Sequence, residues 1–160
     1  MSSQMIDKPI PEFSLPSTGG KTVSLADFRQ QILVIYFYPK DSTPGCTTEA
    51  QQFRDLHPDF VAAGARIVGV SRDSVRSHEN FKLKQDLPFD LLSDADEALC
   101  TLFSVIKMKS MYGKQVRGIE RSTFVFSSTG ELVREWRGLK VPGHAQEVLD
   151  FVRTLGSPTS

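Results

Sequence analysis

Cysteine is scarce in this 160-residue chain, which contains two, Cys46 and Cys100. Two thiols cannot build the disulfide framework of a small secreted protein, and such scarcity suits a reducing cytoplasm. An excess of charge is also missing, because 19 Lys and Arg residues balance 19 Asp and Glu residues. The balance predicts no basic face for nucleic acid and no acidic tail.

Long apolar runs and targeting signals are missing as well. The longest apolar stretch, residues 32–38, has the length of a strand and falls far short of the ~20 residues of a membrane span. The first 13 residues lack a basic region followed by an apolar stretch, so no secretory signal is expected. We therefore predict a cytoplasmic protein that does not bind membranes, with one domain over residues 1–160 and a flexible tail at 156–160.

Strand-like and helix-like segments alternate along the chain, which predicts an α/β sandwich. Apolar, β-branched runs predict strands at 32–38, 66–71 and 88–92, and turn signals predict hairpins around 18–21 and 128–130. Capped or amphipathic segments predict helices from residue 43 to 64, over 75–85, through 97–103 with Asp94 or Asp96 as the cap, and over 144–155. The basic stretch 107–117 is expected to be a solvated loop, with a mobile lid or a docking surface as the alternatives.

Cys46 lies at a strand-to-helix corner, in the segment YFYPKDSTPGCTTEA of residues 36–50. Thr43 can cap the helix and Pro44 suits its first position, which places Cys46 in the first turn. Unpaired backbone N–H groups there favour negative charge and lower the pKa of a thiol, so that more of it is the reactive thiolate. A buried, inert cysteine is the alternative, and the corner favours the reactive one.

Ionisation alone makes a weak catalyst, because a more acidic thiol gives a less nucleophilic thiolate. A fast thiol enzyme must also bind and polarise its electrophile. The corner offers two hydrogen-bond donors for this purpose, the Thr43 hydroxyl and the Cys46 backbone N–H. A simple helix cap is the alternative role for Thr43.

The segment PKDSTPGC, residues 39–46, matches the motif Pro-x-x-x-Thr-x-x-Cys of the peroxiredoxins. Together with "LLSD", "MYGKQVRGIERSTFVF" and "EWRGLKVPGHAQEVL", it makes almost the whole chain, from about residue 9 to 155, resemble the bacterioferritin comigratory protein or peroxiredoxin Q branch. The resemblance implies a thioredoxin-like α/β fold, with a central mixed β-sheet flanked by helices.

The same resemblance implies an antioxidant peroxidase that reduces hydrogen peroxide and organic hydroperoxides without metal, haem or flavin. Its partners would be the peroxide and a thiol reductant, namely thioredoxin, glutaredoxin or glutathione, and the protein would be a monomer. We expect no cofactor and no bound metal.

The resemblance also assigns roles to five residues. Cys46 attacks the terminal oxygen of the peroxide, Thr43 hydrogen-bonds the peroxide, and Pro39 shields the site from water. Arg121, in "IERSTF", stabilises the thiolate and the leaving oxygen, and Glu49 holds that arginine. A surface ion pair is the alternative for Arg121, and an acid that suits the helix dipole is the alternative for Glu49.

This sequence departs from its relatives at the cysteine that would resolve a sulfenic acid. Many members of the branch have it five residues after the first cysteine, where this chain has Gln51. Others have it on the following helix, where this chain has Lys82. Cys100 lies among apolar neighbours, which favours buried packing. We therefore expect a one-cysteine cycle in which an external thiol regenerates Cys46.

Three other functions are weighed against this one. A thiol–disulfide oxidoreductase is disfavoured because Glu49 occupies the second position of a C-x-x-C motif. A redox sensor or holdase would use Cys46 as a switch without turnover. A Cys–His hydrolase would need a histidine folded beside Cys46. The three histidines, which are scattered and show no metal-ligand spacing to the cysteines, are His57, His78 and His144.

Overall fold

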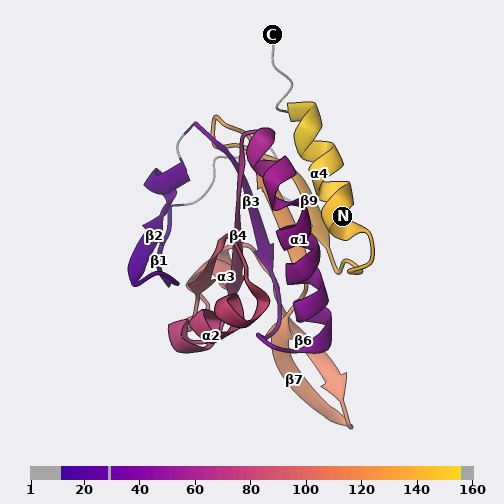
Figure 1. Cartoon of the computed structure of the whole chain (residues 1–160). Coiled ribbons are helices and arrows are strands. Elements are labelled where there is room, and N and C mark those ends of the chain that lie inside the picture. Colours follow the sequence, from indigo (N-terminus) through magenta and orange to yellow (C-terminus); the bar gives the residue numbers. More distant parts are fainter. Residues whose placement is uncertain (1–11, 29, 156–160) are drawn as a thin grey trace.

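A computed structural model describes residues 12–28 and 30–155 (Figure 1). Its main sheet has the strand order β2-β1-β5-β4-β3-β8-β9. These strands are β1 (Ser14–Ser17), β2 (Lys21–Ser24), β3 (Ile32–Phe37), β4 (Ala65–Ser71), β5 (Asp90–Ser93), β8 (Ser122–Phe126) and β9 (Leu132–Arg137). The expected tail, residues 156–160, lies outside the described residues.

The sheet is mixed, as expected. Strand β3 pairs with β4 in parallel and with β8 antiparallel, so the centre of the sheet joins both kinds of ladder. The helices are η1 (Leu25–Phe28, a 3₁₀ turn), α1 (Pro44–Ala62), α2 (Val75–Gln85), α3 (Ala98–Leu102) and α4 (His144–Leu155). Among the described residues, no helix is both long and apolar enough to span a membrane.

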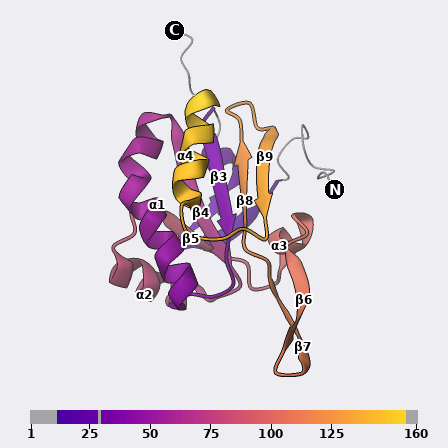
Figure 2. The same ribbon diagram turned by 90° about the vertical axis from the view of Figure 1, so that its right-hand side faces the viewer.

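Strand β3 separates two apolar cores, because successive side chains of a strand point to opposite faces. Val34, Tyr36 and Tyr38 belong to the core beneath α1, α2 and α4, which also contains Cys46. Leu33, Ile35 and Phe37 belong to the other core, which contains Cys100 of α3. Helices α1 and α4 lie side by side on the first face (Figures 1 and 2). The two cysteines therefore lie on opposite faces of the sheet.

Two strands, β6 (Ile106–Met111) and β7 (Lys114–Ile119), form a separate antiparallel sheet that projects from the body (Figures 1 and 2). We call this hairpin the arm. The expectation of an irregular loop over 107–117 was wrong. Tyr112 and Gly113 both have positive φ, 52° and 78°, as the two central residues of a tight hairpin turn require. The sequence lacks the usual Asn-Gly signal there, since tyrosine takes the first position.

The other elements match the sequence closely. Of the two proposed caps for α3, Asp94 is the one used: its carboxylate accepts from the backbone N–H groups of Leu99 and Cys100. Ser74 caps α2 in the same way, accepting from the N–H of Ser77. Both are local signals, which explains why the sequence carried them.

Candidate active site

Cys46 lies where the chain leaves β3 and enters α1, at the end of the molecule from which the arm projects (Figure 1). Proline occupies the first position of α1, which is where a missing backbone N–H costs nothing. Cys46 is the third residue of the helix, and 1% of its surface is exposed. The thiol is thus held at the start of a 19-residue helix and is nearly shielded from water.

Thr43 stands at the cap position of α1, yet its side chain does not cap the helix. Its hydroxyl donates to the carbonyl oxygen of Lys40 at 2.9 Å instead. The hydroxyl proton is therefore engaged, and what Thr43 offers a ligand is a lone pair that accepts a hydrogen bond. The sequence had suggested a donor. The first backbone N–H groups of α1, including that of Cys46, are left without a side-chain cap.

Arg121 joins the two acidic groups of the site. It lies between β7 and β8, and its Nη1 donates to Glu49 Oε1 at 2.7 Å and to Cys46 Sγ at 3.5 Å. Glu49 follows Cys46 by three residues, so the carboxylate and the thiol share one face of the helix. The Glu49 side chain is 1% exposed and that of Arg121 is 18% exposed. A surface ion pair does not describe Arg121, because its partner is buried.

The Glu49 carboxyl is an unusual group to find in an apolar core. Burial raises its pKa to about 7, and this effect outweighs the opposing influence of Arg121. Its second oxygen, Oε2, has no hydrogen-bond partner among the described residues. Such a carboxyl costs stability, and a functional site is where such a cost is commonly found.

Gly45 provides the space that Arg121 occupies. A Cβ atom on residue 45 would lie 3.1 Å from Nη2 of Arg121, which is closer than most such contacts. The glycine of the Pro-Gly pair therefore lets the guanidinium lie against the first turn of α1. The sequence indicated a corner at this pair but not the contact of Gly45 with Arg121.

The loop between β3 and α1 is anchored by buried polar groups that the sequence did not reveal. Tyr38 donates its hydroxyl proton to Asp41 at 2.6 Å, and Ser77 of α2 donates to the same carboxylate at 2.8 Å. His78, fully buried, lies 2.7 Å from Asp41 through Nδ1 and donates from Nε2 to the carbonyl of Leu92. These contacts fix the loop that carries Pro39 and Thr43 against α2 and β5.

Known proteins that resemble this chain identify its family. The AhpC/TSA family matches residues 6–135. The chain belongs to this family. It is 56% identical to Peroxiredoxin Bcp of Xanthomonas campestris pv. campestris, over 93% of this chain and 94% of the relative. It is 46% identical to Peroxiredoxin Bcp of Bacillus subtilis, over 94% and 96%.

Solved structures of peroxiredoxin Q have the same thioredoxin-like fold. One from Xanthomonas campestris superimposes with a TM-score of 0.86 at 56% identity, covering 91% of this chain and 92% of the other. One from Xylella fastidiosa superimposes with a TM-score of 0.90 at 46% identity, covering 96% and 98%. The protein is thus a peroxiredoxin, an oxidoreductase that reduces peroxides at the expense of thiols.

In this peroxiredoxin, both positions at which relatives would carry a resolving cysteine are engaged in polar contacts. Gln51 of α1 donates from its side-chain amide to the side-chain oxygen of Gln85 at the end of α2. Lys82 of α2 forms an ion pair of 2.9 Å with Asp90 of β5. These contacts connect α2 to its neighbours on both sides.

Cys100 is fully buried on the far face of the sheet, and neither cysteine forms a disulfide. Burial, together with a hydrogen bond to Asp94 and its charge, raises the pKa of the Cys100 thiol far above its ordinary value. The expectation that Cys100 packs in a core is confirmed.

The histidines of this peroxiredoxin do not reach the thiol. Within the described part of the chain, the side chain that hydrogen-bonds Cys46 Sγ is Arg121, so the Cys–His hydrolase alternative has no support. His144 shares a hydrogen bond of 2.8 Å with Thr123, and burial lowers its pKa to about 4. The group whose spacing could suit a metal ion is Asp41, Asp73 and His78. Its donor atoms are already bound to one another or to neighbouring groups.

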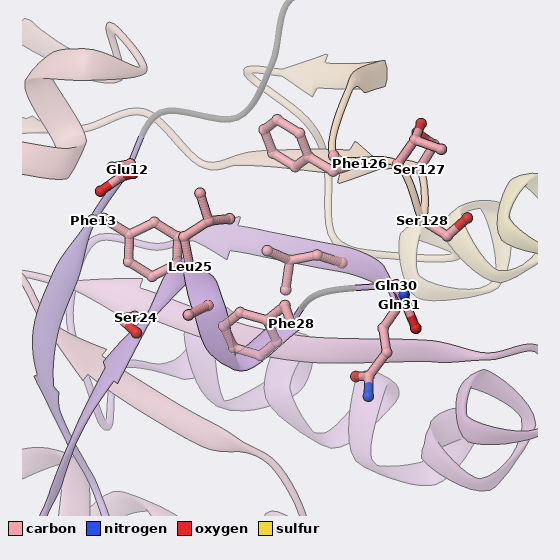
Figure 3. Close-up of a pocket in the computed structure, with 14 residues that line it drawn as sticks. Glu12, Phe13, Ser24, Leu25, Phe28, Gln30, Gln31, Phe126, Ser127 and Ser128 are labelled. Atoms are coloured by element: carbon pink, nitrogen blue, oxygen red, sulfur yellow. The ribbon is translucent and has the colours of Figure 1, made fainter.

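A sizeable hollow of the described structure lies away from the thiol. This cavity, of about 510 Å³, is at the opposite end of β3, where Phe13, Leu25, Phe28 and Phe126 surround it and serines line its edge (Figure 3). No cysteine, histidine or arginine lines it. The reacting group of a hydroperoxide is small, so its binding does not require a cavity of this size.

Proposed function

We propose that Cys46 is the peroxidatic cysteine and that Thr43, Arg121, Glu49 and Pro39 complete the catalytic site. The observation that carries this proposal is the guanidinium of Arg121, which contacts the thiol sulfur and a buried carboxylate with the same nitrogen. Such a group stabilises a thiolate and, during the reaction, the negative charge on a leaving oxygen.

In the proposed step, the Cys46 thiolate attacks the terminal oxygen of a hydroperoxide. An S–O bond forms as the O–O bond breaks, and the electron pair leaves with the second oxygen, which takes up a proton to give water or an alcohol. The sulfur is oxidised to a sulfenic acid. The uncapped N–H of Cys46 and the guanidinium donate to the peroxide, and Thr43 accepts from its O–H group. Pro39, half-buried beside the loop, limits the access of water.

We further propose a one-cysteine cycle. Gln51 and Lys82 replace the cysteines of relatives, and Cys100 lies across the sheet from Cys46. A disulfide requires two Cα atoms within about 7 Å, so joining these thiols would require the sheet to open. Instead, an external thiolate attacks the sulfenic sulfur, and an S–S bond forms as the S–O bond breaks. The leaving hydroxide takes up a proton to give water, and a mixed disulfide remains. A second thiolate then attacks that disulfide and releases reduced Cys46.

The proposed substrates are hydrogen peroxide and organic hydroperoxides, and structures of the Xanthomonas campestris bacterioferritin comigratory protein, at 55% identity, concern its alkyl peroxide reduction activity. The proposed reductant is thioredoxin, glutaredoxin or glutathione. We place the protein in the cytoplasm, because two free thiols suit a reducing compartment. The proposed oligomeric state is a monomer.

Mass spectrometry of the intact protein after one equivalent of peroxide tests the cycle. We expect a gain of one oxygen, trapped by dimedone at Cys46. A loss of two hydrogens, mapped to a Cys46–Cys100 bond, would overturn the one-cysteine cycle. Catalytic peroxide consumption with any of the three reductants separates an enzyme from a sensor or holdase, which would consume peroxide once and stop. Insulin disulfide reduction, which a thiol–disulfide oxidoreductase catalyses, should be absent.

A further inference from the structure

The arm is exposed along most of its length, and its base is buried in the body at Ile119. Residues 107–110 and 112–117 are exposed, and the strands of the arm make their extensive contacts with each other. A two-stranded sheet is marginally stable by itself in water, so an exposed hairpin of this kind suggests a role in binding.

The two faces of the arm differ in charge. The register pairs Met108 with Arg117 and Lys109 with Val116, and paired residues point to the same side. Arg117 forms an ion pair with Glu97, which precedes α3, so this face is tied to the body. The opposite face is formed by Lys107, Lys109, Lys114 and Val116, and we call it the lysine face.

The lysine face has no acidic counterpart. No Asp or Glu occurs in the sequence from residue 105 to 119. Lys107, Lys109 and Lys114 form no ion pair within the described part of the chain. The net charge of the whole chain is zero, so the three lysines around exposed Val116 form a local patch of positive charge. Exposed Val116 lies among these lysines, whereas exposed Met108 lies on the opposite face with Arg117.

The position of the arm relates it to the site. Strand β7 ends at Ile119, two residues before Arg121, and the arm extends from the end of the molecule at which α1 begins (Figures 1 and 2). Six residues of strand reach about 20 Å. A protein that docks over Cys46 through a typical interface, ~800 Å² on each side, covers a disc of about 16 Å in radius. The base of the arm lies inside such a disc.

We propose that the lysine face is the docking surface for a protein reductant of the thioredoxin or glutaredoxin class whose surface beside the reactive cysteine is acidic. This inference rests on the proposed function, because the reductant must reach the sulfenic acid at Cys46. Opposite charge would raise the rate of encounter and orient the attacking thiolate toward Cys46.

A second copy of this chain is a poorer occupant, because two lysine faces repel each other, and lysines on exposed strands discourage pairing between edges. Nucleic acid is a poorer occupant too, since three lysines release few counterions and the rest of the chain adds no excess positive charge.

The triple variant Lys107→Glu, Lys109→Glu, Lys114→Glu tests the proposal against Arg153→Glu, an exposed change on α4. Two half-reactions are measured separately: oxidation of reduced protein by hydrogen peroxide, and reduction of oxidised protein by the organism's own thioredoxins and glutaredoxins or by dithiothreitol. We expect the triple variant to lose at least about tenfold in the second-order rate constant with the physiological redoxin at low ionic strength, and to recover most of it in 0.5 M salt. Recycling by dithiothreitol and oxidation by peroxide should stay within about twofold, as for Arg153→Glu.

The outcomes separate the inference from the function on which it rests. Unchanged rates with every redoxin would overturn the docking surface and leave the peroxidase mechanism intact. A wild-type protein that peroxide does not oxidise at Cys46 would remove the mechanism itself. Concentration-dependent dimerisation of the wild type that the triple variant abolishes would show a second copy as the occupant and overturn the proposal. Reversing acidic residues of the redoxin should restore its rate with the triple variant.

Discussion

Cys46 and Cys100 occupy matching positions, since each is the third residue of a helix and each is buried. They differ in what the start of the helix offers. Asp94 caps α3 and takes the N–H of Cys100, whereas no side chain caps α1. The nearest charge is a guanidinium at Cys46 and a carboxylate at Cys100. Burial is equal, so the two thiols differ in the charge beside them and in the free N–H groups at the start of the helix.

Exchanging each thiol for a hydroxyl tests this comparison most directly. We expect Cys46→Ser to abolish peroxide turnover with the fold unchanged, because a serine hydroxyl is a far weaker nucleophile at neutral pH. Cys100→Ser should keep near-normal turnover. The measurement is steady-state peroxide consumption with an excess of reductant, with circular dichroism as the check on folding. Loss of turnover in Cys100→Ser alone would reverse the assignment.

Removing the cation beside each thiol should separate the two sites by rate. We expect Arg121→Ala to slow peroxide attack by on the order of 10²-fold or more, the scale of losing one transition-state donor. Arg72, which binds Glu97 on the side of Cys100, provides the matched control, and Arg72→Ala should change this rate little. Stopped-flow oxidation and a thiolate titration are measured together. If the loss of rate only follows the thiolate fraction, the guanidinium acts on ionisation rather than on the peroxide.

Asp94 caps α3, whereas Thr43 leaves α1 uncapped and presents a lone pair of its hydroxyl oxygen. We expect Thr43→Val to slow attack by about 10²-fold, and Thr43→Ser to retain most of the rate because it keeps the hydroxyl. The check is the second-order rate constant for hydrogen peroxide. Equal losses in the two variants would mean that the methyl group, and not the hydroxyl, is what matters.

The pKa of Glu49 predicts how stability changes with pH. The folded-state pKa, about 7, lies above the ordinary 4.5 of the unfolded chain. The stability contributed by the protonated acid is therefore present below pH 4.5 and is lost as pH rises through 7. As pH rises through this range, the free energy of unfolding of Glu49→Gln should increase relative to that of the wild type by on the order of 3 kcal/mol. Denaturant unfolding from pH 4.5 to 8 measures it, with exposed Glu131→Gln as the control. Parallel curves for wild type and Glu49→Gln would contradict the prediction.

Gly45 gives the smallest expected effect and separates activity from stability. Gly45→Ala adds a methyl group 3.1 Å from Arg121 Nη2, so the guanidinium must shift by a few tenths of an ångström. We expect a several-fold slower attack on peroxide. An alanine in a helix is favoured over glycine by up to about 1 kcal/mol, so the free energy of unfolding should not fall. A slower attack with lower stability would point to a general disturbance of the helix.

The local elements followed from local signals. Pro44 at the helix start, Ser74 and Asp94 as caps, and the apolar run of β3 each act within a few residues, which is why the sequence predicted them. The arm was missed because residues 107–110 and 112–117 are exposed, so no apolar alternation marked its strands. The anchoring of the loop by His78 was missed because His78 and its partner Asp41 lie 37 positions apart in the chain.

The sequence alone determined the strand-to-helix corner, the thiol in its first turn and the absence of a second cysteine at the expected positions, because all three depend on neighbouring residues or on identity. Tertiary structure decided the rest. It brought Arg121 to Cys46 across 75 positions, buried Glu49 beneath it and put Cys100 on the other face of the sheet. The strength of a charge and the acidity of a thiol depend on burial and distance, which exist once the sheet has formed.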